Sequence, residues 1–112
     1  MNKTSILLIE PPPLGNYGNQ RSKGAFGNLK TDIRWPPIDL MVIAGHLKKN
    51  NFPVFLIDGG GEKLTIGELK NRIKPLNPQI IILNTSTTTI YHDLSIVKEI
   101  KLIKPDAFIG VI

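Results

Sequence analysis

The chain has 112 residues, a formal net charge of +5 and a hydrophobic fraction of 41%. This length suits one domain, and this hydrophobic fraction excludes a generally disordered chain because it supplies side chains for a core. The chain has no cysteine, which excludes disulfides, thiolate catalysis and cysteine-ligated zinc or iron–sulfur clusters within these residues. No apolar run reaches the roughly 18–20 residues that a membrane-spanning helix needs, so we predict no membrane partner.

The amino terminus indicates where the protein is located, and the placement of charge indicates which partners it has. The apolar run of residues 5–9 is too short for a signal peptide, so we predict a cytoplasmic location. Basic residues gather at positions 48–49, 70–74 and 98–104, each near the predicted end of a helix. Cations at helix ends favour the helix dipole, so the positive charge does not indicate a nucleic-acid partner.

Apolar runs and helical patterns alternate along the chain. Continuous apolar runs predict buried strands, which cover residues 3–9, 53–57, 79–83 and 107–112. Apolar side chains at helical spacing predict one helix after each of the first three strands, over residues 38–47, over residues 65–74, and up to Pro105. The first of these helices is apolar on most of its circumference, so we expect it to be buried on most sides. Thr65 and Glu68 have the spacing of a capping box at the start of the second.

This alternation predicts one α/β domain over residues 1–112, with a three-layer Rossmann-like (flavodoxin-like) fold. Its four parallel strands would have helices on both faces, with the third strand beside the first and the second outside it. Flavodoxin-like sheets have about five strands. We therefore expect a chain truncated before the fifth strand, as in a fragment of a longer protein, or a homodimer that pairs through the exposed edge strand of residues 107–112.

Polar segments follow the strands at the edge of the sheet where ligands of α/β proteins bind. The loop from Glu10 to Pro37 is too long for a plain connection, which indicates a functional segment. Asp58 and the glycines after it end the second strand, and a run of hydroxyls, residues 85–89, ends the third. Hydroxyls and backbone amides at a helix N-terminus can bind phosphate or amide groups, although the same run also suits plain capping.

Several functional classes lack their sequence signature. Neither G-x-G-x-x-G after the first strand nor G-x-x-x-x-G-K-[S/T] is present, which disfavours dinucleotide binding and nucleoside triphosphatase activity. Asn84 ends the third strand where a response-regulator receiver needs an aspartate. His46 is expected to be a structural residue of the first helix, and His92 to lie in the first turn of the third. Their spacing matches no metal motif and no acid–base pair is evident, so the chain alone is not predicted to be catalytic.

Several motifs, taken in order, resemble a known family. A proline-rich turn follows Glu10, Trp35 to Leu40 enters a helix, Ala44 to Asn50 ends it, Val54 to Asp58 forms a strand, and Asn84 to Thr89 leads into the third helix. Their order and spacing resemble the N-terminal cobalamin-binding domain of cobalamin-dependent radical SAM enzymes. The resemblance implies that cobalamin is the cofactor and that these turns bind it, through Glu10, Pro11, Pro12, Leu14, Gly15, Asp58, Gly59, Thr85, Ser86, Thr87 and Thr88.

One departure from the family pattern changes the implied cobalt ligation. Many cobalamin proteins carry D-x-H-x-x-G after the first strand, whose histidine ligates cobalt, whereas this chain has Glu10-Pro11-Pro12-Pro13-Leu14-Gly15. Pro12 cannot ligate a metal, so the resemblance implies base-off cobalamin with no histidine ligand from this turn. It also implies that the iron–sulfur cluster and S-adenosylmethionine belong to a radical SAM domain downstream of Ile112. There the cofactor would relay a methyl group or assist radical chemistry.

Two other functions fit the residues. One is a non-catalytic α/β interaction or assembly domain that uses the long loop as a partner-binding segment. The other is a nucleotide- or phosphate-binding domain in which the hydroxyl run acts with Arg21, Lys23 and Arg34. The stretch from Asn16 to Arg34 carries no recognised motif, and we expect it to be poorly ordered.

Overall fold

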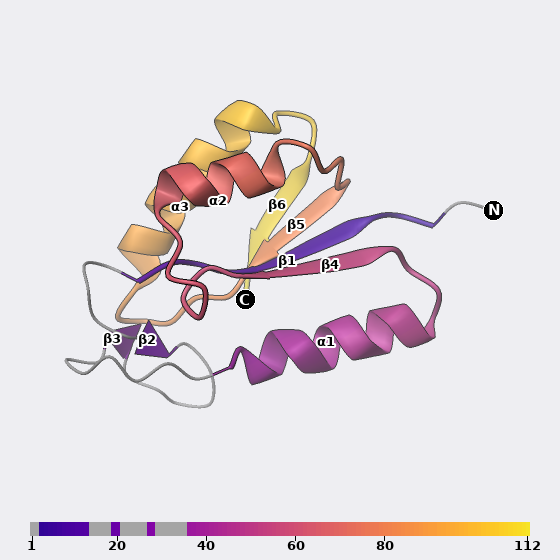
Figure 1. Cartoon of the computed structure of the whole chain (residues 1–112), viewed down its shortest axis with the longest axis horizontal. Coiled ribbons are helices and arrows are strands. Elements are labelled where there is room, and N and C mark those ends of the chain that lie inside the picture. Colours follow the sequence, from indigo (N-terminus) through magenta and orange to yellow (C-terminus); the bar gives the residue numbers. More distant parts are fainter. Residues whose placement is uncertain (1–2, 14–18, 21–26, 29–35) are drawn as a thin grey trace.

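The computed structural model describes residues 3–13, 19–20, 27–28 and 36–112. Figure 1 shows a central sheet between two helical layers. The main elements in chain order are β1 (Ile6–Glu10), α1 (Ile38–Lys49), β4 (Val54–Asp58), α2 (Ile66–Ile73), β5 (Ile80–Leu83), α3 (Ile90–Ile103) and β6 (Phe108–Val111). Two short segments within the long loop, β2 (Asn19–Gln20) and β3 (Gly27–Asn28), pair antiparallel with each other, which was not predicted.

The four longer strands form one parallel sheet in the order β4-β1-β5-β6. This confirms the predicted Rossmann-like α/β architecture, with the third predicted strand beside the first and the second outside it. The chain leaves β1 in one direction through α1 and then returns in the other through α2 and α3. Right-handed crossovers therefore place α1 on one face of the sheet and α2 with α3 on the other (Figure 1).

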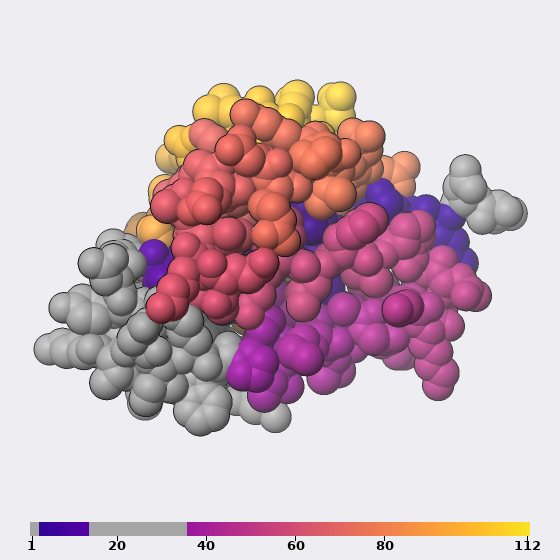
Figure 2. Space-filling model, viewed as in Figure 1, coloured from indigo at the N-terminus to yellow at the C-terminus, as the bar shows by residue number. Residues whose placement is uncertain are grey.

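The main core lies between the sheet and the helices α2 and α3. Alternate residues of the strands point to this face because side chains along a strand alternate between its two sides. Figure 2 shows that little of β1 reaches the surface between the two helical layers, and every residue of this strand is buried. The buried members of this core are Leu7, Ile9, Ile57, Leu69, Ile73, Ile81, Leu83, Ile96, Ile100 and Ala107.

Helix α1 is less buried than its sequence predicts. It packs on β4 and β1, and Leu40 is the residue of this helix that is buried. Ile38, Met41 and Val42 are 41%, 50% and 67% exposed, and His46 is exposed as well. The expectation that this helix is buried on most sides is wrong, because the side with Ile38, Met41 and Val42 faces away from the sheet. Apolar composition cannot tell which side a neighbour covers.

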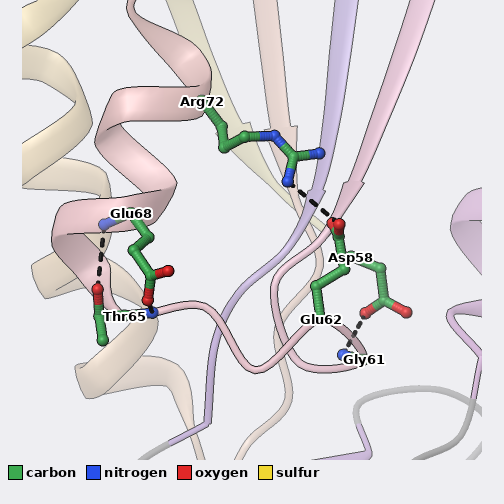
Figure 3. A network of polar contacts seen from close by, with 6 residues as sticks. All are labelled: Asp58, Gly61, Glu62, Thr65, Glu68 and Arg72. Carbon is green, nitrogen blue, oxygen red and sulfur yellow. Dashed lines mark hydrogen bonds and ion pairs between the residues drawn. The ribbon is translucent and has the colours of Figure 1, made fainter.

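The predicted capping box at the start of α2 is confirmed. The Glu68 backbone N–H donates to Thr65 Oγ1 at 3.1 Å, and the Thr65 backbone N–H donates to Glu68 Oε1 at 3.0 Å (Figure 3). Arg72, one helical turn further on, forms an ion pair with Glu62 at 3.1 Å. These contacts fix the start of α2 relative to the turn that follows β4.

In the part of the chain that the structure describes, every helix is too short or too polar to cross a membrane.

Candidate functional site

The carboxyl ends of β1 and β5 meet through a buried side-chain contact. Asn84 Nδ2 donates to Glu10 Oε2 at 3.0 Å, and the Asn84 backbone N–H donates to the carbonyl of Ile9 at 3.0 Å. Glu10 and Asn84 are only 5% and 4% exposed. A buried carboxylate is costly without hydrogen bonds, so this contact stabilises Glu10 and joins the two turns. The long loop and the hydroxyl run therefore meet at the switch point of the sheet, as the predicted topology requires.

The start of the long loop is packed into the protein. Pro11 and Pro12 are buried, and Pro13 is half-buried. The carbonyl oxygen of Pro12 lies 3.1 Å from Nε2 of His92, in the first turn of α3. A carbonyl can only accept, so this ring nitrogen carries the proton and donates. The contact ties the first turn of the loop to α3.

The hydroxyl run is organised by a buried aspartate that sequence reasoning missed. Asp93 is 0% exposed, and its Oδ2 accepts hydrogen bonds from Thr85 Oγ1 and Thr89 Oγ1, both at 2.7 Å. Ser86 Oγ lies 2.8 Å from Thr89 Oγ1. The signal in the sequence was the spacing of Asp93 four residues after Thr89, which places both on one side of a helix. The hydroxyls of Thr85 and Thr89 thus hold the turn in shape.

The outer part of the run lies at the surface of the protein. Thr87 and Thr88 are exposed, immediately before α3. Thr89 at the N-cap makes no side-chain capping bond to the helix, so the first-turn amides of α3 are not capped in this way. Exposed hydroxyls beside such amides can accept or donate hydrogen bonds to a polar ligand.

The turn after β4 completes this edge of the sheet. The carboxylate of Asp58 accepts from the Gly61 backbone N–H at 2.8 Å (Figure 3), and the Gly59 N–H donates to the carbonyl of Glu10 at 2.8 Å. A Cβ on Gly59 would lie 2.8 Å from that carbonyl oxygen and 3.0 Å from the backbone nitrogen of Pro12. Glycine is therefore needed where this turn meets the loop, and one carboxylate oxygen of Asp58 stabilises its own turn.

Part of the predicted site lies outside the described residues. This holds for Leu14 and Gly15, for the basic residues Arg21, Lys23 and Arg34, and for most of the stretch from Asn16 to Arg34. The remaining predicted residues gather at one edge of the sheet, from three different turns. Within residues 3–13, 19–20, 27–28 and 36–112, no group of three or more histidine, aspartate or glutamate side chains could hold a metal ion.

Comparison with known proteins finds a relative that is named a methyltransferase. Over 109 residues the chain is 28% identical to an "uncharacterized methyltransferase PH0819" of Pyrococcus horikoshii, a match that covers 97% of this chain and 21% of that protein. The chain thus spans about a fifth of the length of this relative. No protein-family model matches the chain. No solved structure matches it either.

Proposed function

We propose that residues 1–112 form a cobalamin-binding module that acts together with a radical SAM domain outside these residues. The observation that carries the proposal is the joining of the first turn and the hydroxyl run at the switch point of the sheet, through Glu10 and Asn84 and through Pro12 and His92. Three of the motifs that resemble the cobalamin domains lie at this same edge: the turn after Glu10, the strand end at Asp58 and the run from Asn84 to Thr89. Similarity to a protein named a methyltransferase supports a role in methyl transfer.

Two groups of described residues, one buried and one exposed, fit such a cofactor. Glu10, Pro11 and Pro12 are buried, so they would form the floor under the ligand and hold the two turns together. The exposed Thr87 and Thr88, with the first-turn amides of α3, would contact the polar nucleotide tail. Bound cobalamin would supply the methyl-carrying or radical chemistry, while these residues bind and orient it.

The residues at this edge also support the base-off form without a protein ligand to cobalt. Pro12 stands where a ligating histidine would be needed, and it has no donor atom for a metal. The histidine of α3, His92, donates its Nε2 proton to the Pro12 carbonyl, so this nitrogen has no lone pair for a metal. Iron–sulfur and S-adenosylmethionine chemistry would require cysteines, and they would come from the partner domain because this chain has none.

Retention of hydroxocobalamin tests this proposal. We expect the purified chain to keep the absorbance of the cofactor after incubation and desalting, with the visible spectrum of the base-off form. Thr87→Arg, at the carboxyl edge, should weaken retention by blocking the tail, whereas Asn77→Arg, at an exposed position of the opposite edge, should not. A colourless wild-type protein, or equal retention by both variants, would contradict the proposal.

A second candidate, an interaction or assembly domain, is favoured by the exposed apolar side of α1. Ile38, Met41 and Val42 project from it, and apolar side chains gathered on a surface mark protein contacts. Met41→Glu would then abolish association with a partner while leaving cobalamin retention unchanged.

A third candidate is phosphate binding at the start of α3. It is tested by adding inorganic phosphate without cobalamin and recording a change in the amide resonances of residues 87–92.

A further inference from the structure

The hydrogen bonds within the hydroxyl run have a direction, and the buried carboxylate of Asp93 sets it. A carboxylate can only accept, so the hydroxyls of Thr85 and Thr89 both donate their protons to its Oδ2 atom, at 2.7 Å. This distance is typical of a hydroxyl that donates to an ionised oxygen. The hydroxyl proton of Thr89 is therefore committed to Asp93.

Thr89 Oγ1 consequently acts as an acceptor toward Ser86. Ser86 Oγ lies 2.8 Å from it, and the Ser86 backbone N–H donates to the same oxygen at 3.2 Å. Two hydroxyl oxygens this close need a proton between them, and the proton of this pair comes from Ser86. Thr89 thus donates to Asp93 and accepts from both groups of Ser86, which uses all of its hydrogen-bonding capacity.

Ser86 is left with lone pairs, and no proton, for a ligand. A serine hydroxyl has a single proton, and here it points into the protein toward Thr89. The hydroxyl of Thr88, at 3.3 Å, can donate to one lone pair of Ser86 Oγ. Ser86 is half-buried beside the exposed Thr87, so the remaining lone pair can accept from a group that binds at the surface.

The charge of Asp93 acts in the same direction as these hydrogen bonds. Asp93 lies fully buried in the first turn of α3, where its negative charge offsets the positive end of the helix dipole. Charges inside a protein are screened less than charges in water, so an anion bound at this turn would be repelled by Asp93. An uncharged donor would not be repelled in this way.

We propose that Asp93, acting through Thr89, makes Ser86 a hydrogen-bond acceptor that selects an uncharged donor, an amide N–H or a hydroxyl, over phosphate. Asp93 is then a positioning residue, because it sets the polarity of an atom that contacts the ligand without touching the ligand itself. The place of the ligand rests on the proposed function, whereas the direction of the hydrogen bonds does not. The nucleotide tail of cobalamin has amide, hydroxyl and phosphate groups, and Ser86 would contact one of the first two.

Neutron diffraction from crystals of the deuterated chain tests the direction without any ligand. We expect one deuterium bonded to Ser86 Oγ and pointing to Thr89, and one bonded to Thr89 Oγ1 and pointing to Asp93. A deuterium on Ser86 that points to solvent, or one on the Asp93 carboxylate, would overturn the proposal.

Two valine variants separate the polarity of Ser86 from a general loss of structure. Thr89→Val and Thr85→Val each keep the shape of the side chain and remove one hydroxyl from the same oxygen of Asp93. Thr89→Val also removes the acceptor of the Ser86 hydroxyl, which frees the Ser86 proton for a ligand. Thr85→Val leaves that acceptor in place and is the matched control.

Acetamide and acetate are suitable probes, because they have nearly the same shape and acetamide alone carries N–H donors. In NMR titrations followed at the amide resonances of residues 86–88, the wild type and Thr85→Val should shift with acetamide and not with acetate. Thr89→Val should shift with acetate. Circular dichroism should show the helical signal of the wild type in both variants, and the deuterium positions decide if Thr89→Val does not fold.

A wild type that responds equally to both probes, or to neither, would overturn the proposal. A folded Thr89→Val that keeps the preference of the wild type would overturn it as well. Failure of the wild type to retain hydroxocobalamin would contradict the proposed function, while the two probes would still decide the polarity of Ser86.

Discussion

The face of the sheet under α2 and α3 and the face under α1 are formed by the same strands, yet they are buried to different extents. On the first face, Ile81 and Leu83 of β5 are 0% exposed and pack against two helices. On the second, their neighbours Ile80 and Ile82 are only partly buried, and Phe108 of β6 is 67% exposed. The two crossovers through α2 and α3 cover one face, while the single crossover through α1 packs on β4 and β1 at the other.

This difference shows how topology, rather than composition, distributes the core. Residues 80–83 are apolar without interruption, so both faces of β5 carry apolar side chains that gain stability from burial. The order of the strands decides which of the two faces is covered by helices. The consequence is a fully buried core on one side and a partly exposed apolar surface on the other, which continues to Phe108 of β6.

The largest expected effect comes from truncating neighbouring residues of β5 on opposite faces. Ile81→Ala should lower the free energy of unfolding by about 3–4 kcal/mol, because it empties a fully enclosed site. Ile82→Ala should cost about 1 kcal/mol, because this half-buried side chain loses less apolar contact. Urea denaturation of the two variants measures the difference. Equal losses would show that the two faces are covered equally in solution.

Removal of the buried carboxylate of Asp93 should be the next largest effect. Asp93→Ala leaves the hydroxyls of Thr85 and Thr89 without their acceptor, which should cost about 2–3 kcal/mol. Asp93→Asn keeps one side-chain oxygen, and it should recover about 1 kcal/mol of that loss. Thermal unfolding compares them. If both variants unfold like the wild type, the network does not hold the hydroxyl run.

Alanine should have opposite effects at two glycines. Gly59 lies in the packed turn at the carboxyl edge of the sheet, and Gly45 lies on the exposed side of α1. Gly59→Ala places a Cβ against backbone atoms of Glu10 and Pro12, and it should destabilise the protein by about 2 kcal/mol. Gly45→Ala meets no atom within 4 Å, and it should stabilise by about 0.5–1 kcal/mol because alanine is the better helix former. A loss of stability in Gly45→Ala would show that something covers this side of α1.

The smallest effect is expected on the exposed apolar side of α1. Val42 is 67% exposed, so Val42→Gln should change the free energy of unfolding by no more than about 0.5 kcal/mol. The same denaturation experiment measures this variant. A cost of several times that size would place Val42 in an interface, which would favour the interaction-domain alternative over an open surface.

The sequence was most informative where a pattern is local and periodic. The apolar runs predicted the strands and, with right-handed crossovers, their order, and the Thr65–Glu68 spacing predicted the capping box that the structure contains. Burial of α1 was predicted wrongly, because an apolar stripe does not reveal whether a neighbour covers it. The contacts of Asp93 and His92 were missed because each depends on how α3 docks onto the turns.

The central proposal is that the joined turns at the carboxyl edge bind cobalamin by its nucleotide tail. Its most direct test compares the binding of two ligands. Equilibrium dialysis of the chain should give binding of cobalamin at least about tenfold tighter than that of cobinamide, which lacks the tail, a difference of about 1.4 kcal/mol. The preference should fall in Thr87→Arg and persist in Asn77→Arg. Equal affinity for the two ligands, or no binding of either, would contradict the account.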